Sequence, residues 1–532
     1  MHIQAHIAVI GGGFGGVSAA LAALGAGRTV VMTEPTRWLG GQLTSQMVPL
    51  DEHRFIETDG ANESYRHFRN MLREYYRQNF PLRPEAKSTP NLNPGAGWVS
   101  PVCVDPRVAV AVIDQLLLPH LISGRLRLLT EVAVVSVATE GDFIAGVTVQ
   151  AADGEQTTIG AEIYLDATEH GDLLDLGGVE FVTGTESQRE TGEPGAPDFS
   201  DPLNTQAVAW CFALEHREGE NHTIDRPQDY AHWRDLRAPQ LHDEPLFAFA
   251  PRDETQHGWT FEPNPDDDPF RVNLDHYDQG LRPSLWLFRR IAARKLFAPG
   301  YLASDITLVN WPMNDYFGGS LYMGEDAPKH WGQAKAQSTS LLYWLQNDAP
   351  RPDGGTGWPG LRLRSDVAGT SDGFAMHPYI RESRRIKARK TILEQELSTA
   401  YRGDRGAERY WDTVGTGHYF WIDRHHTTRH DLPFLGYPHP FEIPLGALIP
   451  VRMRNLLPAC KNIGTTQITN GSYRLHPVEW SIGEASGAFA AHCLDVNSEP
   501  HAIYDDPQAV ANFQNVLAHR GIQLRWADSK RR

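Results

Sequence analysis

Cysteine is scarce in this sequence of 532 residues. Its four cysteines, Cys103, Cys211, Cys460 and Cys493, lie far apart and form no CxxC pair. This spacing supports neither a disulfide framework nor a cysteine zinc site, so a reducing compartment fits best and no metal site is predicted. The chain also lacks any apolar run of about 20 residues and any basic, apolar leader before residue 6. We therefore expect a soluble, cytoplasmic protein that has no membrane partner.

Positively charged residues are also fewer than negatively charged ones. The chain has 49 Lys and Arg against 66 Asp and Glu, a net charge of −17. Because such a field repels phosphate backbones, nucleic acid is not an expected partner. Apolar residues make up 41% and charged residues 22%, which indicates a folded globular protein and excludes a disordered or fibrous one. The length predicts about two to four domains or lobes.

The start of the chain has the pattern of a dinucleotide-binding unit. The sequence predicts a short strand over residues 6–10, a glycine-rich turn over 11–16 and a helix over 17–24. Gly11 permits the tight turn, Gly13 lets a pyrophosphate approach the helix N-terminus, and Gly16 lets the helix pack on the strand. A second strand leads to Glu34, 21 residues after Gly13, where an acid can bind a ribose diol. The pattern fits NAD and FAD equally well.

Later segments favour FAD. The segments are Arg37–Gln46 (RWLGGQLTSQ), Leu126–Val132, Ile163–Thr168, Asn455–Ile463 and Arg474–Gly487 (RLHPVEWSIGEASG). In this order they resemble segments of FAD-dependent oxidoreductases of the glutathione reductase superfamily. The resemblance implies that Gly41, Gln42 and Leu43 pass beside the ribityl chain and isoalloxazine ring, and that Val132 lies against the adenine. The other cofactor contacts that it implies are Ala167, Gly483 and Glu484.

The fold expected from these features is α/β, with a discontinuous Rossmann-like FAD-binding domain and an irregular α+β substrate domain. The FAD-binding domain is expected over residues 1–184 and 415–500, the substrate domain over 185–414, and a C-terminal helix and tail over 501–532. The middle segment is punctuated by Pro and Asp and loses regular periodicity. Helices are expected over about 62–79, from 106 to 121 and over 506–520, and a three-stranded meander over 133–165.

Catalysis by a flavin oxidoreductase requires a group that accepts the substrate proton as a hydride leaves, and histidine suits this role near neutral pH. Of the 23 histidines, His425 and His476 lie in segments that resemble the family. Asp423 would orient His425 if a turn brought their side chains together. A purely structural role is the alternative for each histidine. Arg381 opens a basic segment, expected to be helical, and is a candidate to hold a substrate carboxylate.

These observations predict an FAD-dependent oxidase or dehydrogenase. It would transfer a hydride from a small polar metabolite to the flavin, and the electrons would pass to oxygen or to a carrier. One alternative is a flavoprotein monooxygenase that uses NAD(P)H, although the sequence has no second GxGxxG between a strand and a helix. The other alternative is a non-catalytic, flavin-binding redox sensor.

Overall fold

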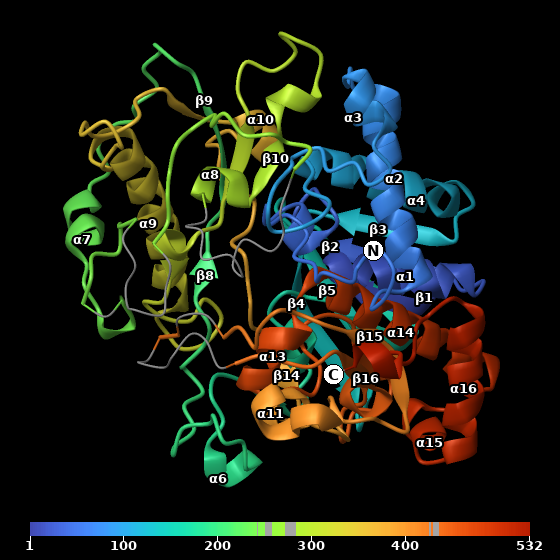
Figure 1. Ribbon diagram of the computed structural model, residues 1–532. Helices are drawn as coiled ribbons and strands as arrows, with labels where there is room; N and C mark the ends of the chain where they lie inside the picture. The colour runs from blue at the N-terminus through green and yellow to red at the C-terminus, as the bar shows by residue number, and fades with distance from the viewer. Residues whose placement is uncertain (242, 250–257, 272–283, 425–426, 429–435, 532) are drawn as a thin grey trace.

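A seven-stranded sheet organises the half of the molecule that contains both chain ends (Figure 1). The computed structural model describes residues 1–241, 243–249, 258–271, 284–424, 427–428 and 436–531. The sheet has the order β3-β2-β1-β6-β5-β4, and β17 pairs with β6. Its strands are β1 (His2–Ile10), β2 (Val30–Glu34), β3 (Leu126–Thr130), β4 (Val132–Glu140), β5 (Phe143–Ala151), β6 (Gln156–Asp166) and β17 (Leu456–Pro458). The pairs β3–β2, β2–β1, β1–β6 and β6–β17 are parallel. The pairs β6–β5 and β5–β4 are antiparallel and form the meander.

The alternation of side chains along β1 builds a core on each face of this sheet. Ile7 and Val9 belong to the large core cluster that includes the first helix, α1 (Phe14–Gly25). Ala8 and Ile10 point the other way, into a smaller cluster with Leu173 of α5 (Asp172–Leu176). Because successive side chains of a strand point to opposite faces, a strand with both faces covered must be apolar throughout.

Helix α1 is rich in small residues because it packs closely against a second helix, α14 (His476–Asp495). A Cβ at Gly483 would overlap the carbonyl oxygen of Gly15, and one at Gly487 would overlap that of Ala19. The Ser18 hydroxyl also donates to the Trp480 carbonyl at 2.8 Å. The two ends of the chain therefore lie side by side, blue against red in Figure 1.

Further helices and a small sheet surround this unit. They are α2 (Glu63–Asn79), α3 (Pro84–Ser88), α4 (Pro106–Ile122), α13 (Gln467–Tyr473), α15 (Pro500–Tyr504) and α16 (Pro507–His519), with strands β15 (Thr413–Gly417) and β16 (Phe441–Pro444). The Asp105 side chain accepts the Arg107 backbone N–H and caps α4, as its Asp-Pro start predicts. The helices expected over 62–79, 106–121 and 506–520 are confirmed by α2, α4 and α16.

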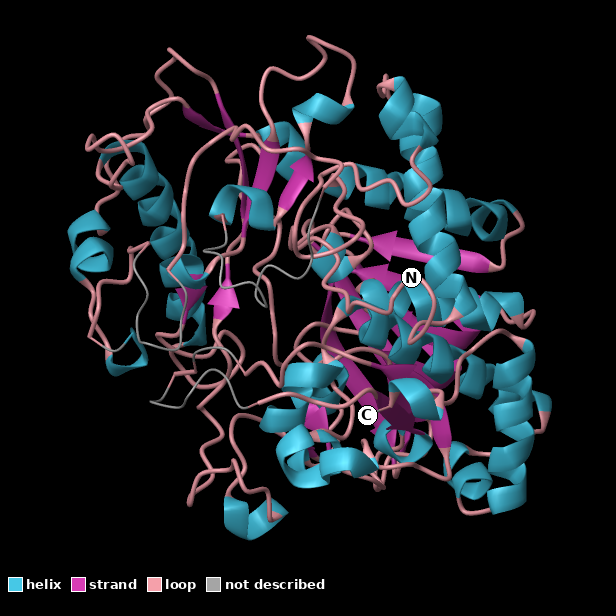
Figure 2. Cartoon of the chain, in the orientation of Figure 1, coloured by secondary structure: helices cyan, strands magenta, loops and turns pink. Residues whose placement is uncertain are grey.

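The middle of the chain forms a second lobe with short elements and long connections (Figure 2). A four-stranded antiparallel sheet has the order β10-β11-β9-β13. The strands of this lobe are β8 (Val208–Ala209), β9 (Phe212–His216), β10 (Arg290–Ala292), β11 (Ile306–Val309), β12 (Asp315–Tyr316) and β13 (Leu361–Leu363). Its helices are α7 (Tyr230–Asp235), α8 (Leu285–Phe288), α9 (Ala327–Asn347) and α10 (Ser365–Ala368). The other elements of the middle segment are β7 (Phe181–Val182), α6 (Gln188–Thr191), β14 (Arg385–Ile386), α11 (Glu394–Leu397) and α12 (Thr399–Arg402), and of these β14 and α11 lie beside α13 in Figure 1. The predicted α/β fold class, a parallel-sheet unit plus an irregular lobe, is confirmed.

One predicted element is wrong. The basic segment that starts at Arg381 is not a helix; it is extended and includes strand β14, which pairs with β7. Arg385 is fully buried, and its guanidinium bonds to Glu382 at 2.5 Å and Glu186 at 2.8 Å. A buried ion pair with the distant Glu186 and strand pairing with β7 therefore override the solvent-exposed helical face that the charge pattern suggests.

Candidate functional site

The loop between β1 and α1 consists of Gly11, Gly12 and Gly13, so no side chain covers its backbone; we call the space beside it the cradle. Gly11 has φ of +104°, and a Cβ there would overlap the carbonyl oxygen of Ala167. A Cβ at Gly13 would lie 2.9 Å, and one at Gly41 2.7 Å, from the same atom, Oε1 of Glu169. The glycine-rich turn and the later Gly-Gly segment therefore border one space, which begins at the N-terminus of α1. Such a space suits a phosphate group, because the helix N-terminus presents N–H groups and positive dipole.

Glu34 ends β2 beside this cradle. Its Oε2 accepts the Gly12 backbone N–H at 3.0 Å, and its Oε1 accepts the Thr36 backbone N–H at 3.0 Å and hydroxyl at 2.6 Å. Burial raises the pKa of Glu34 to about 7, although these hydrogen bonds oppose the shift. The acid thus stands where the sequence pattern requires a partner for a ribose.

A buried polar cluster closes the cradle from the C-terminal part of the chain. Glu479, in the first turn of α14, accepts the Gly15 backbone N–H at 3.0 Å and a hydrogen bond from Gln42. Lys461 Nζ lies 2.6 Å from Glu169 Oε2 and 3.6 Å from Glu479 Oε2. Burial favours the neutral amine, but these two carboxylates outweigh it and raise the pKa of Lys461. Lys461 is therefore charged and lies between two carboxylates beside the cradle.

Two orphaned polar atoms show that the cradle fits a polar ligand. Gln42 Oε1 and Glu169 Oε1 are buried and have no hydrogen-bond partner among the described residues. Because buried polar atoms normally find partners, both are suited to a group with donors, such as the hydroxyls of a ribityl chain or ribose. The glycine backbones, the helix N-terminus and Lys461 suit the pyrophosphate of the same molecule.

The other predicted cofactor residues belong to several elements around the cradle. Leu43 ends the short 3-10 helix Gly41–Leu43, and Val132 opens β4 directly after Glu131, a left-handed residue with φ of 58°. A Cβ at Gly16 would overlap the Gly11 carbonyl, so this glycine allows the predicted close packing of helix on strand. Gly483 lies at the crossing of α1 and α14. Glu484 faces α2, where it accepts hydrogen bonds from Asn62 at 2.8 Å and Ser64 at 2.6 Å.

Of the two predicted catalytic histidines, the structure describes only His476. His476 is fully buried at the start of α14, and its Nδ1 accepts the Asp51 backbone N–H at 3.0 Å. Burial, reinforced by the charges of Arg289 and Lys461, lowers its pKa well below the usual value. His425 lies outside the described residues. Its predicted orienting partner, Asp423, has Oδ2 3.4 Å from the guanidinium of Arg474.

Arg381 is held by the middle lobe. Its guanidinium donates to Asp315 at 2.7 Å, to the Ala207 carbonyl at 2.7 Å and to Asn310 at 3.3 Å. Its carbon Cζ lies 4.9 Å above the centre of the Tyr379 ring. The terminal nitrogens that would hold a carboxylate therefore already have partners within the chain.

Sequence reasoning missed a group of buried charges near the start of α14. Arg474 donates to the Tyr379 hydroxyl at 2.8 Å, and Arg289 lies 3.4 Å from Asp51 Oδ2. Together with Arg381, three guanidinium groups thus surround or approach Tyr379. Arg474 belongs to the RLHPVEW segment and could have been proposed from it, whereas nothing in the sequence around Arg289 identifies that residue.

Sequence reasoning also missed a group of rings beside the Gly40–Gln46 segment. It consists of His170, Tyr322, Trp331 and His377, with ring centroids 5.1–6.0 Å apart in the pairs that touch. His170 follows β6, Tyr322 and Trp331 belong to the middle lobe, and the His377 backbone N–H donates to the Ser45 carbonyl at 3.2 Å. Only the folded chain brings these side chains together.

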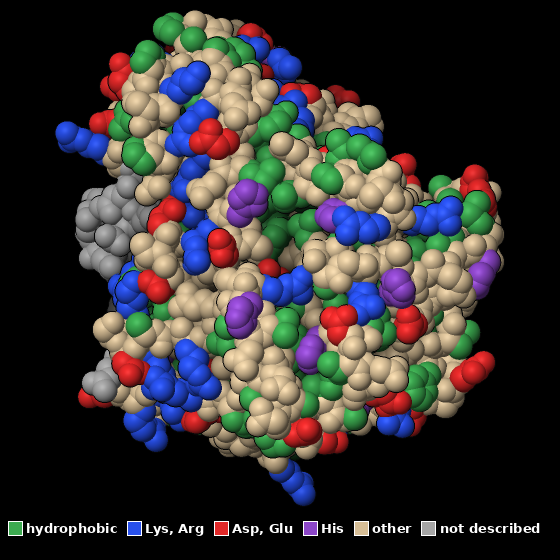
Figure 3. Space-filling view, turned by 90° about the vertical axis from the view of Figure 1, so that its right-hand side faces the viewer, with side chains coloured by type: hydrophobic (Ala, Val, Ile, Leu, Met, Phe, Trp, Pro, Cys, Tyr) green, Lys and Arg blue, Asp and Glu red, His purple; other side chains and the backbone are tan. Residues whose placement is uncertain are grey.

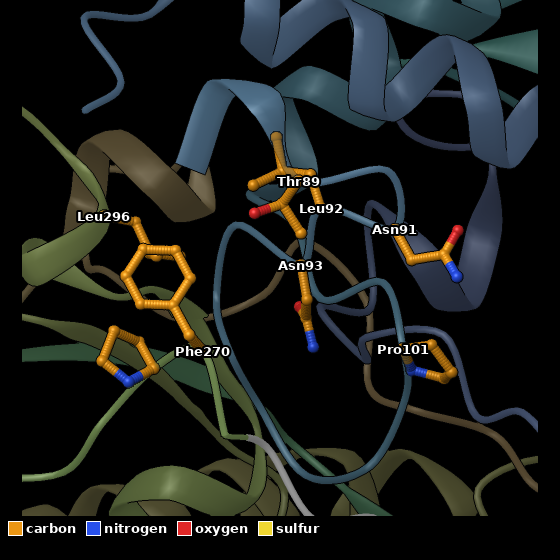
Figure 4. Close-up of a pocket in the computed structure, with 8 residues that line it drawn as sticks. Thr89, Asn91, Leu92, Asn93, Pro101, Phe270 and Leu296 are labelled. Carbon is orange, nitrogen blue, oxygen red and sulfur yellow. The ribbon is translucent and has the colours of Figure 1, made fainter. Parts of the chain in front are cut away.

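Two surface pockets lie away from this region. One, of about 190 Å³, is lined by Thr89, Asn91, Leu92, Asn93, Pro101, Pro269, Phe270 and Leu296 (Figure 4). The other, of about 500 Å³, lies between α1, α14 and α16. Figure 3 views the right-hand side of the molecule, where acidic and basic side chains are interspersed around a hollow. In the described part of the chain, no helix is long and apolar enough to cross a membrane, and no group of His, Cys, Asp or Glu has the arrangement of a metal site.

A comparison of the chain with the profiles of protein families agrees with the glycine pattern of the cradle. The profile of the family named FAD dependent oxidoreductase matches residues 6–517. The chain belongs to this family. It is therefore an FAD-dependent oxidoreductase, and the predicted enzyme class and cofactor are confirmed.

Comparison with solved structures finds partial similarities to other flavoproteins. L-proline dehydrogenase from P. horikoshii is 16% identical, with a TM-score of 0.18 over 36% of this chain and 26% of that chain. The myxobacterial chondrochloren halogenase CndH is 16% identical, with a TM-score of 0.22 over 42% of this chain and 46% of that one. CabE, an aromatic hydroxylase from angucycline biosynthesis, is 17% identical, with a TM-score of 0.23 over 42% and 38%. The chain thus covers less than half of each of these proteins, and no curated protein matches it in sequence.

Proposed function

We propose that this FAD-dependent oxidoreductase is an oxidase or dehydrogenase that takes a hydride from a small polar metabolite. The supporting observation is the buried group formed by Arg289, Arg474, Tyr379 and Asp51 near the start of α14. The Nε of Arg474 is buried and has no hydrogen-bond partner among the described residues. It can bind a polar group of a small molecule, whereas an apolar substrate would leave it unpaired. The electrons then pass to oxygen or to a carrier.

FAD, when bound, supplies the ring that accepts two electrons from the substrate. We assign its pyrophosphate to Gly11, Gly13 and Gly16, and its adenosine ribose to Glu34. The remaining contacts that we propose are Gly41, Gln42 and Leu43 for the ribityl chain and the ring, Val132 for the adenine, and Ala167, Gly483 and Glu484 along the same path. Lys461 joins this set because its charge lies at the cradle.

We further propose that the FAD-binding domain comprises residues 1–184 and 415–500, as in the glutathione reductase superfamily. The support is that β17 pairs with β6 and that α14 packs on α1. Residues 185–414 would form the substrate domain. The four cysteines are free and buried, which fits a reducing compartment such as the cytoplasm.

The sheet arrangement disfavours a monooxygenase that binds NAD(P)H in a dedicated second domain. Every parallel pair of strands in the described ranges belongs to the sheet that contains β1. A second dinucleotide-binding domain would need a parallel sheet of its own. A non-catalytic sensor is disfavoured by the membership of an oxidoreductase family.

Anaerobic mixing tests the proposal. Purified holoenzyme is mixed with a panel of alcohols, amines and hydroxy acids while the flavin absorbance near 450 nm is followed, an approximate position for oxidised flavin. We expect at least one compound to bleach the flavin without NAD(P)H. Bleaching that requires NAD(P)H would support the monooxygenase instead, and no bleaching under either condition would support the sensor.

A further inference from the structure

The ring of His377 lies between the rings of Trp331 and His170 and is partly exposed to solvent. Its centroid lies 5.1 Å from that of Trp331, edge to face, and 5.5 Å from that of His170. The side chain is half-buried, in contrast to the fully buried His476. A base must both keep its orientation and reach a substrate, and of these two histidines His377 meets both requirements.

The hydrogen bonds of His377 fix which ring nitrogen can accept a proton. Nδ1 lies 2.8 Å from the carbonyl oxygen of Pro378. Because a carbonyl can only accept, Nδ1 carries the hydrogen and Nε2 carries the lone pair. Nε2 makes no hydrogen bond to any residue that the structure describes. The lone pair of a neutral imidazole is thus available at Nε2.

The backbone places this imidazole beside the segment assigned to the flavin. The His377 N–H donates to the Ser45 carbonyl at 3.2 Å, and the Ile380 N–H donates to Gln46 Oε1 at 3.3 Å. The segment between them is anchored on β8, because the Tyr379 N–H donates to the Ala209 carbonyl at 2.7 Å. Two of these contacts hold residues 377–380 against the end of Arg37–Gln46, and the third ties them to β8.

The charged groups around His377 come from several elements. Burial lowers its pKa, Lys461 lowers it further, and Glu169 opposes the shift. His170, on the opposite side of the ring, has a pKa well below its usual value because it is buried and faces His377, Arg384 and Lys461. Both imidazoles are therefore neutral at pH 7.

We propose that His377 is the base that takes the heteroatom proton of an alcohol or amine substrate, a role that rests on the proposed hydride transfer. Nε2 accepts the O–H or N–H proton while the hydride on the neighbouring carbon leaves for the flavin. The C–H bond and the O–H or N–H bond break, and a C=O or C=N bond forms; bound FAD would take up the hydride, and the imidazolium then releases its proton to solvent. Trp331 and His170 hold the ring in place.

The test compares His377→Asn with the wild-type holoenzyme in anaerobic flavin reduction. Asparagine keeps a donor for the Pro378 carbonyl but lacks the Nε2 base. With a compound that bleaches the wild-type flavin, we expect reduction to slow by about 100-fold to 10,000-fold while bound FAD is unchanged. Because burial lowers the pKa of His377, the wild-type rate should fall only in the acidic range below the usual histidine pKa, where His377 becomes protonated. The variant should lose this dependence.

His501 provides a matched control. Its Nε2 lies 2.8 Å from the Pro450 carbonyl, and the residue is half-buried in α15, away from the cradle. His501→Asn should reduce its flavin at the wild-type rate. If His377→Asn does not fold, His377→Gln replaces it. Wild-type rates and pH dependence in a folded His377 variant would overturn the assignment and leave the proposed function standing; failure of the wild-type enzyme with every compound would overturn both.

Acylation by diethyl pyrocarbonate gives a readout that needs no turnover. The reagent attacks the lone pair of neutral imidazole, so His377 should react roughly tenfold faster than His501. In His501, Nε2 faces the Pro450 carbonyl and Nδ1 is buried. The adducts are located by peptide mass spectrometry of the holoenzyme. Equal or slower reaction at His377 would show that its Nε2 is not available, and the proposal would be wrong.

Discussion

The glycines around α1 serve two different purposes. The atoms that a Cβ would contact at each position distinguish the two. At Gly13, a Cβ would approach only the end of the Glu169 side chain, at 2.9 Å, and φ is an ordinary −58°. At Gly483, it would overlap backbone atoms of Gly15. A flexible carboxylate can move and a packed backbone cannot. Gly13 is thus reserved for a ligand, whereas Gly483 is required by the fold.

Gly13→Val should therefore abolish FAD binding with little effect on the folded apoprotein. The valine side chain would fill the space assigned to the pyrophosphate, and we expect affinity to fall by about 100-fold or more, which is ~2.7 kcal/mol. The measurement is FAD retained after gel filtration, together with the melting temperature of the apoprotein. Glu34→Ala is the graded comparison, because a hydrogen bond to a charged group contributes ~1.5–3 kcal/mol. Stoichiometric FAD in the valine variant would refute the assignment.

The sequence is most informative about residues whose role is local. Gly11, Gly13 and Glu34 could be assigned because their spacing follows from one strand–turn–helix unit. Lys461 and Glu479 could not be assigned in this way, because Glu479 meets Gly15 across 464 residues of chain. The sequence likewise does not identify His377, whose chemistry depends on which ring nitrogen faces a carbonyl. Residue types alone do not reveal such orientations.

At the scale of elements, helical periodicity predicted α2, α4 and α16 well, because each has an apolar pattern of its own. In addition, aspartate side chains cap the start of α4 and α16. The same reasoning failed for the segment after Arg381. Its arginines are spaced like one face of a helix, but Arg385 is buried with Glu382 and Glu186. Glu382 lies in the same segment, but Glu186 lies 199 residues away, and the local pattern does not contain this second carboxylate.

The packing of α1 on α14 leads to a prediction at this scale. Gly483→Ala should force the two helices apart, because the new methyl group would overlap the Gly15 carbonyl. Overpacking of this kind costs about 3 kcal/mol. We expect a lower melting temperature in the variant, measured by circular dichroism. Gly332→Ala in α9 is the control: a Cβ there meets nothing within 4 Å, so stability should be unchanged or slightly raised. Equal melting temperatures in both variants would show that the helices can separate without cost.

At the scale of the whole molecule, the two ends of the chain complete each other. β17 extends the sheet beside β6, and α14 covers α1 and brings Glu479 to the Gly15 N–H. The middle lobe is inserted between these two parts of the sequence and appears on the other side of the molecule (Figure 1). The discontinuous arrangement was predicted from segments at both ends, but the pairing of β17 with β6 follows only from the structure.

This arrangement predicts that residues 1–184 alone do not bind FAD. Without α14, the small apolar side chains of α1 would face water, and the cradle would lack Lys461 and Glu479. Exposed apolar surface destabilises the fragment, and loss of the buried cation removes charge stabilisation of the pyrophosphate. Residues 415–532 produced in the same cells should restore part of the binding if they dock on the first fragment. The readout is FAD that remains with the protein after gel filtration. Stoichiometric FAD in the 1–184 fragment alone would show that the cradle is complete within the N-terminal part, and the discontinuous cofactor domain would then be wrong.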